Sequence, residues 1–171
     1  MAAKVYRTAP QEQESDIMSN SFVKTDARTE AKSFFVLGDK VERRARLTGN
    51  WLNIFDVTVE PGGRTPRHAH ASPEVFRIIE GTLTIWRLTD TGPEEIEASE
   101  GDIVTIAPFM VHGYSNNGTV PAVFSAIVDH DMAEFIETAG VTEQPQDSPS
   151  PETVARMRAA ANAHGITILA A

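Results

Sequence analysis

Hydrophobic and polar residues alternate along the middle of the chain with the period of two that is typical of β-strands. Residues 52–59 show this most clearly, because Phe55, Val57 and Val59 fall on one face and polar residues lie between them. Further short runs of apolar and β-branched residues, separated by turn-forming clusters, predict strands at 33–37, 41–47, 74–79, 82–88, 94–98, 103–106 and 120–128. Strands this short, spaced roughly ten residues apart, favour an antiparallel sandwich or barrel.

Two of the predicted strands are rich in charge. Residues 41–47 place Arg43, Arg44 and Arg46 between apolar neighbours, which predicts a solvent-facing strand. We interpret these arginines as a charged outer face rather than an anion site. Residues 94–98 are laced with glutamate, which is typical of a short edge strand protected against pairing with another chain.

After residue 130 the period changes to that of helices. Residues 132–139 predict a short helix, with Asp131 as its N-cap, Glu134 at the capping-box position and Gly140 at its end. A polar linker follows at 142–148.

A second helix is predicted after Ser150, which can cap it with Pro151 in the first turn. An apolar stripe along this helix, suited to packing on the barrel or on a second subunit, consists of Val154, Met157, Ala160 and Ala161. His164 stands at the helix C-terminus, where a cation suits the helix dipole, so we interpret it as structural. Residues 166–169 predict a last strand.

Composition narrows the class of protein. The net charge of −9 argues against a nucleic acid or an anionic membrane as partner. The absence of cysteine excludes disulfides, thiolate ligands and thiol nucleophiles. No segment approaches the roughly 20 apolar residues that span a membrane, and residues 1–16 lack the apolar core of a signal peptide. We therefore expect a cytoplasmic protein.

His68, His70 and Glu74 stand within seven residues of one another, ahead of an apolar run. Residues two apart on an extended strand point to the same side, so the two imidazoles should converge, with Glu74 beginning the next strand. Two imidazoles and a carboxylate suit a borderline transition metal. A fourth ligand has to come from the remaining histidines, which are His112, His130 and His164.

The stretch 61–81 and the stretch 101–116 together resemble the two motifs of the cupin family. The first motif is matched at every position, by Gly62, His68, His70, Glu74 and Gly81, and the second is matched by Gly101, His112 and Asn116. Ala107 stands where a proline is usual and Phe109 where a glycine is usual, and these departures bear on the backbone before His112 rather than on its imidazole.

The resemblance implies an all-β cupin jelly-roll barrel, a double-stranded β-helix, with short C-terminal helices. The chain would divide into a partly flexible N-terminal arm at 1–32, the barrel at 33–130 and a C-terminal helical extension at 131–171. The resemblance selects His112 as the fourth ligand, so that His68, His70, Glu74 and His112 would hold one divalent iron, manganese, nickel, copper, cobalt or zinc ion inside the barrel. His130 would be a surface residue or a polar group at the barrel mouth.

The order of segments between residues 33 and 170 is similar to single-domain quercetin 2,3-dioxygenase-like cupins. The function that this implies is a metal-dependent dioxygenase acting on a flavonol or a similar enolisable aromatic molecule, with Glu74 as catalytic base as well as ligand. The same four ligands also suit a non-redox isomerase, lyase or decarboxylase, and a non-catalytic cupin that binds a small ligand. A homodimer is expected, because single cupin domains commonly pair their sheets.

Strand parity counted from Glu74 turns Phe76 and Ile78 inward, and Phe109, Met110 and Tyr114 flank His112. These residues are the candidate walls of a substrate pocket, although bulky apolar side chains also simply fill small barrels.

Overall fold

The computed structural model describes residues 31–47, 52–145 and 150–169. The predicted N-terminal arm lies almost entirely outside the described residues, as does Trp51.

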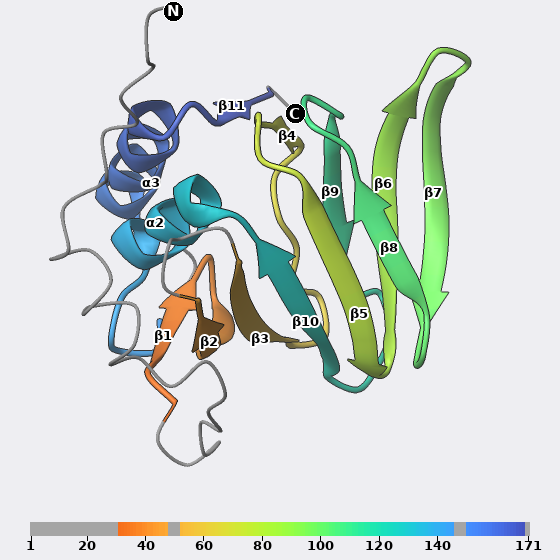
Figure 1. The fold of residues 1–171 in the computed structure, drawn as a ribbon, viewed down its shortest axis with the longest axis horizontal. Coiled ribbons are helices and arrows are strands. Elements are labelled where there is room, and N and C mark those ends of the chain that lie inside the picture. The colour runs from red at the N-terminus through yellow and green to blue at the C-terminus, as the bar shows by residue number, and fades with distance from the viewer. Residues whose placement is uncertain (1–30, 48–51, 146–149, 170–171) are drawn as a thin grey trace, which may run out of the picture.

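The described strands form two antiparallel sheets (Figure 1). The six-stranded sheet has the order β1-β2-β3-β10-β5-β8, with β1 Ser33–Val36, β2 Asp39–Arg46, β3 Asn53–Val59, β10 Ala122–Val128, β5 Glu74–Glu80 and β8 Ile103–Ile106. The five-stranded sheet has the order β11-β4-β9-β6-β7, with β11 Thr167–Ile168, β4 His68–Ala69, β9 His112–Ser115, β6 Thr82–Thr89 and β7 Gly92–Ser99. This arrangement confirms the predicted jelly-roll.

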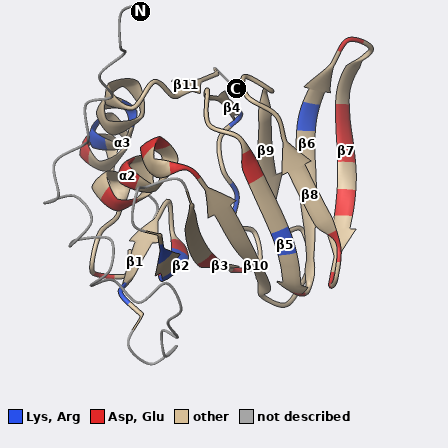
Figure 2. Cartoon of the chain, viewed as in Figure 1, with Lys and Arg blue, Asp and Glu red and all other residues tan. Residues whose placement is uncertain are grey.

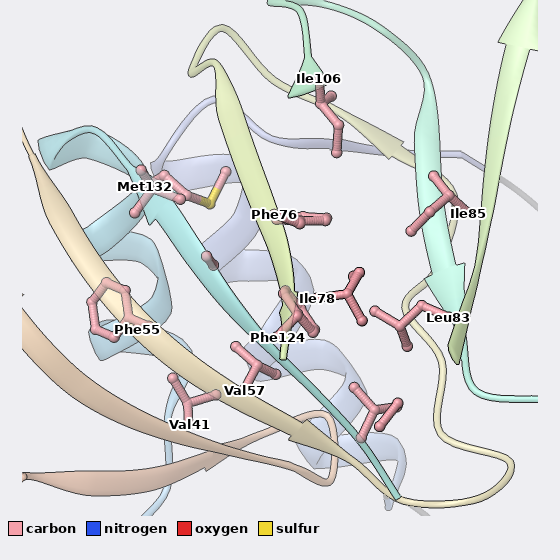
Figure 3. Close-up of a cluster of buried hydrophobic side chains, with 14 of the residues drawn as sticks. Val41, Phe55, Val57, Phe76, Ile78, Leu83, Ile85, Ile106, Phe124 and Met132 are labelled. Atoms are coloured by element: carbon pink, nitrogen blue, oxygen red, sulfur yellow. The ribbon is translucent and has the colours of Figure 1, made fainter. Parts of the chain in front are cut away.

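The hydrophobic core lies between the two sheets. Alternate residues of β3 and β10 are buried along their whole length, as the alternating sequence requires. Figure 3 shows Phe76, Ile78 and Phe124 facing Leu83 and Ile85 of β6. Phe76 and Ile78 are buried, so the strand parity counted from Glu74 is confirmed.

The arginines of β2 are paired with acids or with a histidine. Arg43 forms an ion pair with Glu137, Arg44 Nε lies 3.2 Å from Asp56 Oδ2, and an Arg46 guanidinium nitrogen lies 3.5 Å from His130 Nδ1. The interpretation as a charged face rather than an anion site agrees with these pairs. The strand itself is half-buried, so the expectation of a solvent-facing strand was wrong, because α2 lies over its arginines.

The charged strand β7 is an edge strand, as predicted, but it is eight residues long rather than five. Its register with β6 continues from Thr82↔Ser99 to Thr89↔Gly92. The connection between β6 and β7 is therefore a tight turn at residues 90–91. Figure 2 shows acidic residues along this strand, where they discourage pairing with another chain.

The first C-terminal helix, α2 (His130–Ala139), begins earlier than predicted. Its N-cap is Asp129, whose Oδ1 accepts a hydrogen bond of 3.1 Å from the backbone N–H of Met132. The prediction of Asp131 as cap was wrong. Glu134 does not close a capping box but lies 3.2 Å from His130 Nε2, one turn away.

The second helix, α3 (Pro151–Ala163), has Ser150 as N-cap, as predicted, and its stripe residues Met157 and Ala161 are buried. The two helices lie together at one end of the sheets, and β11 runs from α3 back to pair with β4 (Figure 1). Neither helix in the described part of the chain is long and apolar enough to cross a membrane.

Candidate metal centre

Three histidines meet inside the barrel. His68 lies on β4, His70 directly follows it, and His112 begins β9, where it is the register partner of His68. One ring nitrogen from each can be chosen so that all three lie within 4.8 Å of one another. His70 and His112 are buried, and His68 is half-buried.

Backbone carbonyls decide which nitrogen of each ring faces the centre. Nδ1 of His68, His70 and His112 lies 2.8 Å from the carbonyl oxygen of Pro66, Ser72 and Met110, respectively. A carbonyl oxygen only accepts, so each Nδ1 carries the proton and each neutral ring keeps a lone pair on Nε2. Metal-binding histidines commonly have their second nitrogen oriented in this way.

Glu74 supplies a carboxylate from the opposite sheet, at the start of β5. Its Oε2 lies 3.1 Å from His112 Nε2 and 3.5 Å from His70 Nε2. His70 Nε2 is buried and has no hydrogen-bond partner among the described residues. Neutral imidazole lone pairs facing a carboxylate oxygen repel one another unless a cation lies between them, so this donor set fits a metal ion.

The pKa values support this arrangement. Burial and, to a lesser degree, the neighbouring His112 lower the pKa of His68 to about 4, so His68 is neutral near pH 7. Burial opposes ionisation of Glu74, but positive charge on the neighbouring His112 and His70 rings would outweigh it and hold the Glu74 pKa at about 2, and a bound cation would act in the same direction. Neutral imidazoles beside an ionised carboxylate are the protonation states that metal binding needs.

The remaining motif residues shape the backbone around the centre. The Asn116 amide donates to the carbonyls of Val59 and Val120, both at 2.8 Å, and ties two loops together rather than facing the centre. Gly81 has φ 75°, and a Cβ there would lie 2.9 Å from the Pro121 oxygen, so only glycine fits.

Phe109 stands where the second motif usually has glycine, and it keeps a glycine-like backbone with φ 63°. Its N–H donates to the carbonyl of His70 at 2.7 Å, and its side chain is 74% exposed. The departure from the motif therefore leaves the approach to His112 intact at the expense of local strain.

A cavity opens beside the centre. The space inside it, together with the open solvent at its mouth, is about 800 Å³. It is lined mainly by apolar side chains from both sheets and from the C-terminal segment, together with a few polar ones: Val36, Leu37, Asp39, Val41, Val57, Thr65, Pro66, His68, Glu74, Phe76, His112, Tyr114, Phe124, Ala126, Met132, Phe135, Ile136, Met157, Ile166 and Ile168.

Of the predicted pocket residues, Phe76 and Tyr114 line this cavity. Ile78 belongs to the core behind it, Met110 packs against that core, and Phe109 points largely to solvent; none of these three lines the cavity. Contact with a substrate stays a prediction for Phe76 and Tyr114.

Sequence reasoning missed Asp39, which it assigned to a turn. Asp39 begins β2, is only 3% exposed, and accepts a hydrogen bond of 2.7 Å from the Tyr114 hydroxyl. Burial raises the pKa of Asp39 to about 6; the hydrogen bond from Tyr114 opposes this rise and the charge of Glu60 adds to it. Strand parity from buried Val41 carried the signal, because residues 39 and 41 share a face.

The other two histidine candidates lie outside the cluster. His130 is on α2 beside Arg46 and Glu134. His164 caps the C-terminus of α3 and packs its ring 6.1 Å from that of Phe135, as a structural residue would.

Comparison with known proteins agrees with this geometry. Residues 55–128 match the family described as Cupin domain. The chain is 28% identical over 142 residues to Germin-like protein subfamily 2 member 1 of Arabidopsis thaliana, a match that covers 81% of this chain and 64% of the relative. The matched region thus spans less than two thirds of that protein.

Two solved structures share the fold. An RmlC-like cupin from Shewanella frigidimarina superposes with a TM-score of 0.55 at 15% identity, covering 65% of this chain and 94% of the other. A sugar phosphate isomerase of the cupin superfamily from Silicibacter pomeroyi superposes with a TM-score of 0.51 at 20% identity, covering 63% and 75%.

Proposed function

We propose that this chain, whose residues 55–128 match the Cupin domain family, is a metal-dependent dioxygenase acting on a small, enolisable aromatic molecule. His68, His70, Glu74 and His112 would hold one divalent transition metal. The observation that carries the proposal is the convergence of these four side chains beside a largely apolar cavity, which is lined by three of them, His68, Glu74 and His112.

A divalent ion held by the three neutral imidazoles and the carboxylate would keep a net positive charge and could stabilise a substrate enolate and bind dioxygen. The Nδ1–H bonds to Pro66, Ser72 and Met110 hold the rings in place. Glu74 is the ionisable member of the set and would take the proton of a substrate hydroxyl.

The cavity supports an uncharged ring as substrate. Phe76, Phe124 and Tyr114 contribute aromatic walls, with Phe76 and Phe124 ring centroids 4.7 Å apart. Flat apolar walls beside a polar corner favour a planar molecule that is anchored through oxygen.

The competing function is a non-redox isomerase, lyase or decarboxylase. One observation favours it: the cavity holds two carboxyl groups whose pKa values lie far apart, about 2 for Glu74 and about 6 for Asp39. Such a pair suits acid–base chemistry. The resemblance to a sugar phosphate isomerase, at 20% identity, concerns the fold alone.

The test begins with elemental analysis of protein purified without added metal. Oxygen uptake is then followed with a panel of enolic aromatic compounds, including flavonols. Oxygen consumption that depends on both the metal and the compound supports the proposal. Turnover at the same rate without oxygen would establish the non-redox function, and saturable binding without turnover would make the protein a binding cupin.

The role of Glu74 has its own test. Glu74→Gln keeps an oxygen ligand but removes the base, so turnover should fall much more than metal content. Equal losses of both would reduce Glu74 to a ligand.

A further inference from the structure

The cavity has a second polar group, separate from the four candidate ligands. Asp39 and Tyr114 both line it, and the Tyr114 hydroxyl donates to Asp39 Oδ2 at 2.7 Å. Asp39 comes from β2 of the six-stranded sheet and Tyr114 from β9 of the five-stranded sheet, so the pair bridges the barrel interior. We call Asp39 and Tyr114 the acceptor pair.

The acceptor pair can accept hydrogen bonds from a ligand but has no proton left to donate. A tyrosine hydroxyl has one proton to donate and lone pairs that accept. That proton is used in the hydrogen bond to Asp39, so Tyr114 presents only acceptor lone pairs to a ligand. The ionised carboxylate of Asp39 is likewise only an acceptor. Near neutral pH this part of the cavity accepts hydrogen bonds and donates none.

The negative charge of the cavity also favours a ligand that donates hydrogen bonds and carries no negative charge. Asp39 and Glu74 both line the cavity, and the described residues that line it include no lysine or arginine. Glu60 adds a further negative charge near Asp39. A phosphate or carboxylate on a ligand would therefore meet repulsion at the acceptor pair, where no lysine or arginine side chain among the described lining residues compensates it.

We propose that Asp39 and Tyr114 are specificity-determining residues that select a neutral, largely apolar ligand with a hydroxyl or N–H donor, and reject phosphorylated or carboxylated ones. This rests on the proposed function only in taking the same cavity as the substrate site. The ligand's donor points to the acceptor pair, while its apolar body packs between Phe76, Phe124 and the C-terminal residues Phe135 and Ile166.

The backbone near the acceptor pair leaves room for the Asp39 carboxylate. A Cβ on Gly63 would lie 2.8 Å from a Val59 methyl and 3.1 Å from Asp39 Oδ1, so a side chain there would crowd the acid. The Thr65 hydroxyl accepts the Tyr114 N–H at 3.0 Å and fixes the backbone that carries the phenol. The hydrogen bond to Thr65 holds Tyr114 in place before a ligand arrives.

The test uses three probes that share one ring system: 2-naphthol, 2-methoxynaphthalene and 2-naphthoate. Their dissociation constants are measured at pH 7.5 with the full chain as purified, and metal content is determined on the same sample. The wild-type protein should bind 2-naphthol about tenfold more tightly than the methyl ether, which has no donor. It should bind the anionic naphthoate more weakly than either.

Variants separate the pair from the rest of the cavity. Replacing both polar groups by apolar ones of similar shape, in the double variant Asp39→Leu/Tyr114→Phe, should remove the preference for the naphthol and leave the fold intact. Asp39→Asn, which removes the charge and adds an amide donor, should strengthen naphthoate binding by about tenfold relative to wild type. Asp90→Asn removes the same charge from the exposed β6–β7 turn and should change none of the three constants.

Equal binding of 2-naphthol and its methyl ether, a preference that survives the double variant, or no binding of any probe would each overturn the inference. Tight binding of naphthoate to wild type would do the same. Absence of metal from a sample that still prefers 2-naphthol would instead refute the proposed function and leave the inference standing. Bound metal without the preference would refute the inference alone.

Discussion

At the scale of single residues, the candidate centre depends on the protonation of three imidazoles. Carbonyl oxygens at 2.8 Å occupy each Nδ1–H, so the Nε2 lone pairs are directed at the carboxylate of Glu74. The same backbone contacts that orient the rings also leave each Nε2 unprotonated, so that Nε2 can bind a metal but cannot donate a hydrogen bond.

His112→Ala is expected to lose most of the bound metal, because His112 lies between His68 and Glu74 in the cluster. Metal content after dialysis measures the loss, and circular dichroism checks that the sheets persist. His164→Ala, at the end of α3, is the control and should keep its metal. Full metal retention in His112→Ala would reject the four-ligand site.

Asp39 should make stability depend on pH. Its pKa rises from 3.8 to about 6 on folding, mainly through burial, so the folded state holds the proton more tightly. The wild-type protein should therefore lose about 3 kcal/mol of stability as pH rises from about 4 to about 6, and no more above that.

Asp39→Asn removes this titration, since its amide oxygen still accepts the Tyr114 proton. Urea unfolding of both proteins from pH 4 to pH 8 isolates the difference, because every other group titrates in both. The free energy of unfolding of the variant, relative to that of the wild-type protein, should increase across that interval. A difference that does not change with pH would contradict the burial of a charged Asp39.

At the scale of elements, the start of α2 shows how a cap is chosen. The sequence pattern predicted the cap at Asp131, but the last core strand ends at Val128, so the chain turns at Asp129. The end of β10 therefore decides where the helix begins.

Asp129→Ala should lower the free energy of unfolding by about 1 kcal/mol, because the Met132 N–H loses its acceptor. Asp131→Ala is the matched control, since Asp131 is exposed in the first turn and contributes only to the helix dipole. Chemical denaturation of both variants compares them. A larger loss in Asp131→Ala would restore Asp131 as the cap.

The loop between β8 and β9 holds Phe109 in a left-handed conformation that glycine adopts without strain. Phe109→Gly should therefore stabilise the protein by up to about 1 kcal/mol, since little buried surface is lost from a side chain that is 74% exposed. Phe109→Ala keeps a Cβ and should not be stabilised. Thermal unfolding of the two variants measures the effect, and a destabilised Phe109→Gly would show that the ring has a packing role.

At the scale of the whole molecule, the cavity belongs to no single sheet. The centre joins β4 and β9 of one sheet to β5 of the other, while α2, α3 and β11 complete the apolar wall. The stripe on α3 serves this wall, because Met157 is buried and lines the cavity and Ala161 is buried in the core.

The homodimer stays a prediction. Met157 and Ala161 of the α3 stripe are buried within the chain, so a dimer would use the exposed Val154 of that helix or sheet surface such as Ile103 of β8, which is 64% exposed. Light scattering at micromolar concentration should give twice the chain mass of 18.6 kDa. A mass equal to that of one chain would refute the dimer.

The sequence by itself was sufficient for most of the strands and for the convergence of His68, His70 and Glu74, while its resemblance to the cupin motifs implied the jelly-roll and selected His112. Alternation of period two places residues on one face of a strand, and the spacing of His68, His70 and Glu74 brings them to a single turn between two strands. These are local relations, so they can be read along the chain without knowing what lies opposite.

Only the tertiary structure decided what faces the centre across the barrel. Asp39 and Tyr114 are 75 residues apart, and their hydrogen bond exists because two sheets close over one cavity. The tertiary structure also paired Arg43 and Arg46 of β2 with α2, set the cap of α2 at Asp129 and left Phe109 exposed. Each of these depends on contacts between segments distant in sequence, whose free energy no local pattern encodes.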